Sequence, residues 1–254
     1  MRNRASLIRA LETYRQERLA SSLEDASISE RVIMAWIYHD NSLEGRCFRP
    51  EEVQAAIRHN DREFPSYMRP LLEDVRIYEE AIKWVTSWAK EGQGSLCVEN
   101  LEKLHKHLCQ HEPKEGARVR KNSPVHRDYH QIICPHREVE RRLTDLFERA
   151  ANFKAEENDV LNFAAQFHHE MMFIYPYRRQ PGLLARLFTN LFLLTHNYPP
   201  LILAAHERGA YYDALAMHDA SQLTQLFHQA AWRYLDMSTH TKRQGQAESH
   251  PAAV

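Results

Sequence analysis

The chain has 254 residues and only 7 glycines, about 3% of its length against a typical share of roughly 7%. None of these glycines stands in GxGxxG or GxxxxGKS/T, so the sequence argues against Rossmann and P-loop nucleotide sites. The formal net charge is −1, which provides no overall basic field to attract nucleic acid or a membrane surface.

The first half of the chain is predicted to be helical because its apolar residues recur every three or four positions. Val32, Ile33, Trp36 and Ile37 give one of these helices a broad apolar face, which is typical of a buried helix. That helix ends in the polar turn HDNSLEG. The predicted helices cover residues 6–19, 29–39, 50–59, 65–90 and 98–111.

The second half is also predicted to be helical, after one interruption. Residues 112–135 contain three prolines and short β-leaning pieces, and residues 129–134 are predicted to form a strand or hairpin. Helical spacing returns at residue 136 and continues over 157–174, 182–196 and 211–236. The expected fold is all-α with one small β-hairpin. Residues 1–29 form an N-terminal helix and linker, residues 30–236 the main domain and residues 237–254 a polar, disordered tail.

One loop is a candidate site. The segment YPYRRQPG at residues 175–182 ends one helix at its first proline and opens the next helix after Arg178 and Arg179. Free backbone N–H groups and the helix dipole make such a helix start a generic anion-binding geometry. The alternative is an ordinary turn between helices with solvated arginines.

The segments around this loop carry a wider pattern. His168 stands seven residues before Tyr175, and the loop is followed by LLARLFTNLFLLTHNYPP and, at residues 208–215, by RGAYYDAL. Upstream lie EKLHKHL, GARVR and HRDYHQIICPHREVERRL. In this setting, residues 175–186 resemble the signature H-P-F-x-D/E-G-N-G-R-x-x-R of the Fic domain family.

The resemblance covers roughly residues 30–235, and the identities within the signature are Pro176, Gly182 and Arg186. It implies the mostly helical Fido fold. It also implies a relation to enzymes that transfer AMP from ATP to hydroxyl groups of proteins.

The segment DNSLEG at residues 40–45 resembles the inhibitory motif S/T-x-x-x-E-G/N, which one class of Fic proteins carries on an N-terminal helix. Asp40 stands at the Ser/Thr position, while Glu44 and Gly45 match. In that class the glutamate pairs with the second arginine of the signature and blocks the γ-phosphate position. The resemblance therefore implies a regulatory role for Glu44 and Gly45, an inhibitory helix at residues 30–45 and an ion pair between Glu44 and Arg186. The alternative is that Glu44 caps a surface helix and Arg186 is solvated.

Two departures from the signature concern catalysis. Tyr175 stands where the family has its general-base histidine. Its reference pKa near 10 keeps it protonated at pH 7, about three units or roughly 4 kcal/mol from use as a base. Tyr175 is therefore expected to be a packing residue. Arg179 stands where the family's Asp or Glu holds Mg²⁺, and a guanidinium repels a cation. Arg179 either grips an anion directly or is simply solvated, and no metal ligand is expected.

The phosphate-binding part of the signature has changed as well. Gln180-Pro181-Gly182 replaces G-N-G, and Pro181 has no N–H group to donate. Leu183 replaces the arginine that steadies the terminal phosphates. The residues that remain for ATP, another nucleotide or another anion are Arg178, Arg179, Gly182 and Arg186.

The resemblance also implies a flap, which in the family aligns a target segment by strand addition. The flap residues are His130, Gln131, Ile132 and Ile133. Because polar and apolar residues alternate imperfectly there, a passive hairpin that covers the core is an equal alternative.

Three functions are consistent with this sequence. The first is a Fic-fold pseudoenzyme that binds a protein partner or an anionic ligand and needs no cofactor. The second is a transferase with altered chemistry, whose nucleotide or other diphosphate-linked donor is held by arginines without metal. The third is a partner-binding helical domain without a pocket. Scattered cysteines and the lack of a long apolar run or leader favour a cytoplasmic protein without a membrane or nucleic-acid partner.

Overall fold

The computed structural model describes residues 3–20, 28–60, 62, 64–122, 133–155 and 159–248, with side chains as far as residue 237. Most of these residues are helical, and the only β pairing among them is an isolated bridge between Val119 and Tyr177. The fold is therefore all-α, as the sequence predicts. The α-helices are α1 (Arg4–Ala20), α2 (Glu30–Leu43), α3 (Pro50–Ile57), α4 (Arg69–Glu91), α5 (Val98–Leu108), α6 (Val139–Ala151), α7 (Val160–Ile174), α8 (Pro181–Thr195), α9 (Arg208–Leu215) and α10 (Ser221–Glu248).

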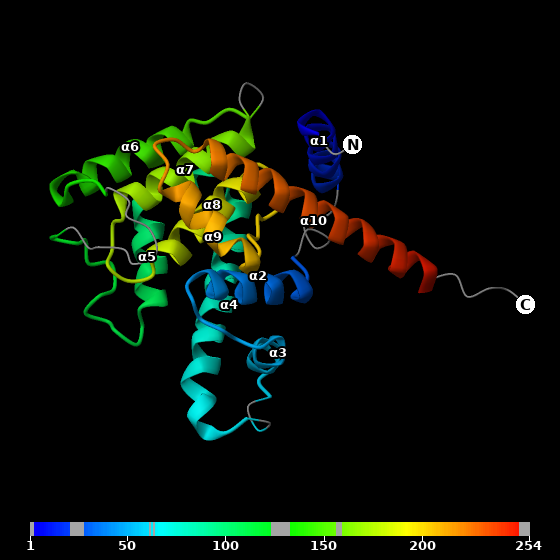
Figure 1. Ribbon diagram of the computed structural model, residues 1–254, viewed down its shortest axis with the longest axis horizontal. Coiled ribbons are helices and arrows are strands. Elements are labelled where there is room, and N and C mark those ends of the chain that lie inside the picture. Colours follow the sequence, from blue (N-terminus) through cyan, green and yellow to red (C-terminus); the bar gives the residue numbers. More distant parts are fainter. Residues whose placement is uncertain are drawn as a thin grey trace, which may run out of the picture.

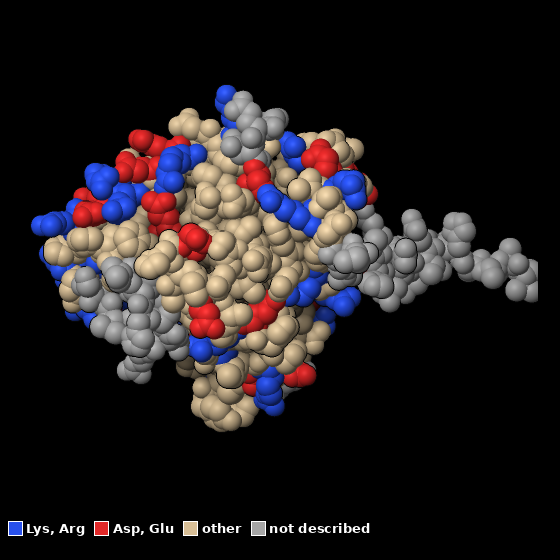
Figure 2. All heavy atoms as spheres, turned by 45° about the horizontal axis from the view of Figure 1, so that its top comes forward, with Lys and Arg blue, Asp and Glu red and all other residues tan. Residues whose placement is uncertain are grey.

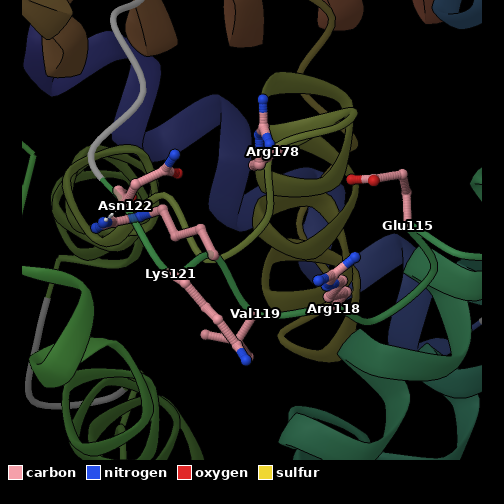
Figure 3. Close-up of a pocket in the computed structure, with 7 residues that line it drawn as sticks. Glu115, Arg118, Val119, Lys121, Asn122 and Arg178 are labelled. Atoms are coloured by element: carbon pink, nitrogen blue, oxygen red, sulfur yellow. Dashed lines mark hydrogen bonds between the residues drawn. The ribbon is translucent and has the colours of Figure 1, made fainter.

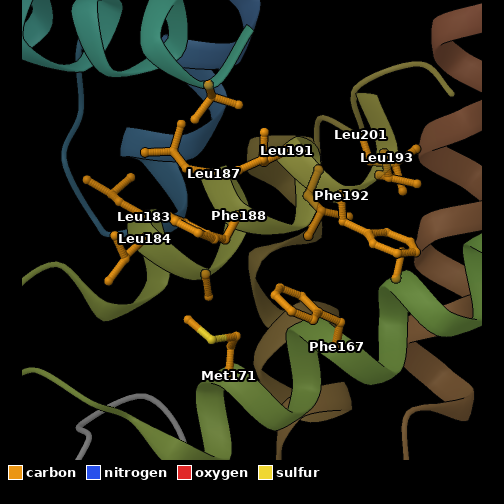
Figure 4. Packing of buried hydrophobic residues seen from close by; sticks show 14 of the residues in the cluster. Phe167, Met171, Leu183, Leu184, Leu187, Phe188, Leu191, Phe192, Leu193 and Leu201 are labelled. Atoms are coloured by element: carbon orange, nitrogen blue, oxygen red, sulfur yellow. The ribbon is translucent and has the colours of Figure 1, made fainter. Parts of the chain in front are cut away.

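Helix α8 forms the centre of the fold because it is apolar on nearly every side. Every residue from Gly182 to Leu193 is buried, which is the pattern of a core helix rather than a surface helix. Figure 4 shows Phe167 and Met171 of α7 on one side of α8, among its leucines and phenylalanines. Helix α4 also packs against α8. The start of α8 is thus held rigidly inside the molecule.

Helix α2 carries the residues that meet the start of α8. Trp36 and Ile37 are fully buried, and α2 packs against both α4 and α8. The helix ends at Leu43, and Gly45 follows with a φ of +80°, a conformation that glycine adopts without steric cost. Residues four apart share one face of a helix, so Asp40 in the last turn and Glu44 just beyond it point the same way.

The first and last described helices lie side by side. Figure 1 shows α1 beside α10, away from the end where α3 and the start of α4 project. Tyr14 and Tyr234 make an edge-to-face contact at 5.9 Å between ring centres, and Arg4 pairs with Asp159 at 2.6 Å. Within the described residues, no helix is long and apolar enough to cross a membrane. On the face in Figure 2, Lys and Arg are interspersed with Asp and Glu, without a continuous basic stripe.

The described C-terminal helices differ from the sequence expectations, and most of the expected hairpin lies outside the described residues. The single helix expected over residues 211–236 is wrong: α9 ends at Leu215, and a new helix starts at Ser221, where the Asp219 carboxylate accepts the Ser221 N–H at 2.8 Å. Helix α10 then runs to Glu248, into the stretch expected to be disordered, because no proline stops it before that point. The predicted hairpin at 129–134 falls mostly outside the described residues, and Ile133 and Cys134 are not in a strand.

Candidate functional site

The loop between α7 and α8 begins at Tyr175, which adopts a left-handed conformation with φ 46° and ψ 62°. A buried guanidinium, that of Arg120, caps this helix end: its Nε donates to the Tyr175 carbonyl at 2.7 Å and its Nη2 to the Ile174 carbonyl at 3.0 Å. A positive charge is favourable at the C-terminus of a helix. Arg120 also donates to the carbonyls of Asn122 and Cys134. It therefore joins Asn122 and Cys134, which stand before and after the flap residues in the sequence, to the loop.

The Tyr175 side chain is 6% exposed and lies in surroundings that oppose its ionisation. Burial, with a smaller contribution from the Glu44 carboxylate, raises the pKa of Tyr175 to about 12, and Arg120 opposes this rise only weakly. Ionising the phenol at pH 7 therefore costs about 7 kcal/mol. The position that the signature gives to a general base is held here by a neutral phenol.

The middle of the loop is pinned by a neutral histidine from α5. His105 stacks on Tyr177 with ring centres 4.0 Å apart and planes 11° from parallel. Its Nδ1 accepts the Ala117 N–H at 2.8 Å, so its Nε2 carries the proton and donates to the Arg179 carbonyl at 3.0 Å. Burial lowers the pKa of His105 to about 4, which keeps the ring neutral. His105 of α5 thus holds the backbone of the basic loop in place through the Arg179 carbonyl and the Tyr177 ring.

The loop arginines lie on the surface. Arg179 pairs with Glu112 at 2.8 Å, with both side chains more than half exposed. Arg178 is exposed and lines two surface cavities. One, of about 150 Å³, also includes Arg118 and Lys121 (Figure 3). The other, of about 350 Å³, also includes Arg46 and Arg179. Neither cavity is lined by Gly182 or Arg186.

The start of α8 is occupied by the end of α2. Glu44 Oε1 lies 2.7 Å from Arg186 Nη2, and the expected ion pair is confirmed. Arg186 is 4% exposed. A Cβ atom added to Gly182 would lie 2.2 Å from Glu44 Oε1, so only glycine leaves room for this carboxylate. The Glu44 carboxylate therefore fills the space where a helix start binds an anion.

Asp40 provides Arg186 with a second carboxylate. Asp40 Oδ1 lies 3.1 Å from Arg186 Nε, a charge contact without the alignment of a hydrogen bond, and Arg186 Nη2 donates to the Asp40 carbonyl at 3.2 Å. Trp36 Nε1 (3.1 Å) and the Tyr78 hydroxyl both donate to Oδ2. Burial raises the pKa of Asp40, while Arg186 and the two hydrogen bonds oppose that rise and favour the carboxylate. Burial lowers the pKa of Arg186, but the carboxylates of Asp40 and Glu44 outweigh this effect and hold the pKa well above its usual range.

A buried hydrogen-bonded chain supports Arg186 from its other side. Arg186 Nη1 donates to the Tyr211 hydroxyl at 3.3 Å, which lies 2.9 Å from His168 Nε2. The Thr189 hydroxyl donates to the Ala185 carbonyl, so it accepts the His168 Nδ1 proton at 3.0 Å. Tyr211 must therefore donate to Nε2. His168 is fully buried, and burial, followed by the charge of Arg186, lowers its pKa to about 3.

This neutral histidine predicts an acid-sensitive fold. The unfolded chain binds a proton on His168 near pH 6.5, whereas the folded chain does so only near pH 3, so stability is full above 6.5 and falls as the pH drops. The expected loss from this group is up to about 5 kcal/mol across that range. Urea titrations at several pH values should show a flatter pH dependence for His168→Gln. The exposed control His136→Gln should keep the wild-type slope, and an unchanged slope in His168→Gln would contradict the assignment.

The remaining predicted site residues are less informative. His130, Gln131 and Ile132 of the flap lie outside the described residues, whereas Ile133 is partly exposed. Among the residues that the structure describes, no group of three or more His, Cys, Asp or Glu could hold a metal ion. The segment 175–182 has no carboxylate of its own.

Sequence reasoning found the loop, Glu44 and Arg186 but missed Arg120, His105 and the partners of Asp40. Arg120 appears in the sequence only as one cation of the segment GARVR. Nothing in that segment distinguishes a buried arginine from its exposed neighbours.

Comparison with known proteins matches residues 95–193 to the Fic/DOC family. A protein adenylyltransferase Fic of Nematostella vectensis is 25% identical over 199 residues, which cover 77% of this chain and 45% of that relative. Its counterpart in Drosophila melanogaster is 30% identical over 126 residues, which cover 48% of this chain and 25% of the relative.

The fold is also that of solved Fic structures. Fic-1 from C. elegans superposes with a TM-score of 0.78 at 17% identity, over 95% of this chain and 73% of that one. A Fic family protein from Desulfovibrio desulfuricans gives 0.70 at 18% identity, over 95% and 76%.

The chain therefore contains a Fic domain, related to protein adenylyltransferases. It spans less than half the length of the two curated relatives above.

Proposed function

We propose that this Fic domain acts as a binding or regulatory protein rather than as a magnesium-dependent adenylyltransferase, and that α2 is its inhibitory helix. The observation that carries the proposal is the position of Glu44. Its carboxylate lies against Gly182 and pairs with Arg186, at the helix start that would otherwise receive an anion.

The state of the neighbouring groups supports this proposal. Tyr175 is a poor general base because its pKa is about 12. The residues present do not fit Mg²⁺, which prefers carboxylate and water oxygens in near-octahedral geometry. Arg179 stands at the metal-binding position of the signature, and its own partner is the Glu112 carboxylate. We therefore derive no catalytic step through a metal ion.

The experiment is intact-mass spectrometry after incubation with ATP and Mg²⁺, on the wild-type chain and on Glu44→Gly. The variant removes the carboxylate that fills the start of α8. We expect no added AMP on either form, because the base and the metal ligand are both missing. ATP-dependent addition of AMP by Glu44→Gly would contradict the proposal, and its loss in Glu44→Gly/Tyr175→Phe would identify Tyr175 as essential.

A second candidate function is favoured by the larger of the two surface cavities that Arg178 lines. Arg46, Arg178 and Arg179 all line it, so it offers three guanidinium groups to a diphosphate-linked donor without metal. Asp74 and Glu112 offset two of these charges through pairs at 3.2 Å and 2.8 Å, which lowers the net positive charge that the cavity presents to an anion. Calorimetry with ATP, CTP, UTP and GTP in EDTA tests this alternative. Binding that is lost in Arg179→Ala would favour it over the binding protein.

A further inference from the structure

Arg186 is held by two carboxylates that differ in how firmly they are fixed. Glu44 lies just beyond the end of α2, its side chain is 18% exposed, and it is followed by Gly45 in a left-handed conformation. Asp40 lies inside the last turn of α2, and its side chain is 1% exposed. Glu44 can leave by a change confined to the helix end, whereas Asp40 can leave only if α2 itself moves.

Asp40 is also fixed independently of Glu44. Trp36, one turn earlier in α2, and Tyr78 of α4 both donate to its Oδ2, which leaves Oδ1 facing Arg186 Nε. The Tyr78 contact joins α2 to α4, the Trp36 contact lies within α2, and neither involves Glu44. Removal of Glu44 therefore leaves Arg186 paired with Asp40.

The charges of this buried cluster decide which ligand it can accept. Asp40, Glu44 and Arg186 sum to −1, and the sum without Glu44 is zero. Arg208 also carries a positive charge, but it lies at the edge of this cluster: it is half-buried, its Nε donates to the Leu43 carbonyl at 2.9 Å, and its guanidinium lies over the Tyr212 ring. Tyr78, Tyr211 and His168 around the cluster are neutral, because burial raises the pKa of both tyrosines and lowers that of the histidine.

We propose that Asp40 is the specificity-determining residue of this site: it neutralises Arg186 permanently, so that the start of α8 accepts a singly charged group such as a carboxylate and rejects a polyphosphate even when Glu44 leaves. The proposal rests on the proposed function, in which Glu44 occupies the site. A polyphosphate carries several negative charges and would enter a buried cluster with no net positive charge to receive it.

The test is calorimetry with inorganic tripolyphosphate in EDTA. We expect the wild type and Glu44→Gly to bind tripolyphosphate with a Kd above about 1 mM. Asp40→Asn/Glu44→Gly, which keeps the size of the Asp40 side chain but removes its charge, should bind at least about tenfold more tightly than Glu44→Gly. Asp145→Asn/Glu44→Gly is the matched control, because it makes the same charge change on the exposed face of α6 and should match Glu44→Gly.

Equal affinity of Glu44→Gly and the Asp40 double variant, including no binding by either, would overturn the proposal. An equal gain in the Asp145 control would overturn it as well. If circular dichroism shows that the Asp40→Asn double variant is unfolded, Asp40→Ser/Glu44→Gly takes its place. Tight binding of tripolyphosphate by the single variant Glu44→Gly would also overturn the proposal. Because this is a binding measurement without ATP or metal, it can fail while the mass-spectrometric test of the proposed function succeeds, and the reverse also holds.

Discussion

Replacing Arg186 by methionine is expected to lower the free energy of unfolding by about 3–5 kcal/mol at pH 7, the usual cost of removing one partner from a buried ion pair. Methionine fills much of the same volume, so the main loss is electrostatic. Asp40, fully buried, loses its countercharge, and so does the Glu44 carboxylate. The Tyr211 hydroxyl also loses a donor. Urea denaturation followed by circular dichroism measures this loss.

The matched double variant shows whether charge is the cause. In Arg186→Met/Asp40→Asn, the uncompensated buried carboxylate becomes a neutral amide, and we expect recovery of at least about 1 kcal/mol relative to Arg186→Met. Arg141→Met on α6 is the exposed control, since its side chain is 64% exposed, and should change stability by less than about 0.5 kcal/mol. A loss of under about 1 kcal/mol in Arg186→Met would show that the cluster is not an electrostatic centre of the fold.

Arg120→Ala is expected to destabilise the chain by about 3–4 kcal/mol. The guanidinium donates to the carbonyls of Asn122, Cys134, Ile174 and Tyr175, and its removal takes a donor from each of them; the last three of these residues are buried. Each unsatisfied buried group costs about 1–3 kcal/mol, and water that enters the space satisfies some of them. The C-terminus of α7 also loses a favourable positive charge.

The control for this prediction lies two residues earlier in the same segment. Arg118 is exposed, and Arg118→Ala should change the free energy of unfolding by less than about 0.5 kcal/mol. Hydrogen exchange provides a local measurement, since Arg120→Ala should speed exchange of the Tyr175 and Cys134 amides. These donate to Met171 and Phe173 in the wild type. Equal effects of the two substitutions would mean that Arg120 is not the anchor of the loop.

Arg120 and Arg186 lie at opposite ends of the same loop. Arg120 holds the segment where α7 ends, and Arg186 with its carboxylates holds the segment where α8 begins. Between them, His105 bonds the Arg179 carbonyl, so the loop backbone is supported at three points. The loop between α7 and α8 is thus held by side chains that lie outside it in the sequence.

The sequence by itself determined the helical fold and one of the key contacts. The three-to-four spacing of apolar residues is a local property of each helix, so it predicts α7 and α8 without knowledge of their neighbours. The pair of Glu44 and Arg186 could be predicted because both residues match short motifs of the Fic family, in which the corresponding residues pair. The tertiary structure alone decided which charged residues are buried. Arg120 and Arg118 are the same residue type in one short segment, yet Arg120 is buried against the end of α7 and Arg118 is exposed.

Asp40 stands in the sequence at a position that the motif gives to Ser or Thr. In the structure it pairs with Arg186 as a second carboxylate, because Trp36 and Tyr78 hold its other oxygen. Burial and pairing depend on segments far apart in the chain, and no local pattern records them.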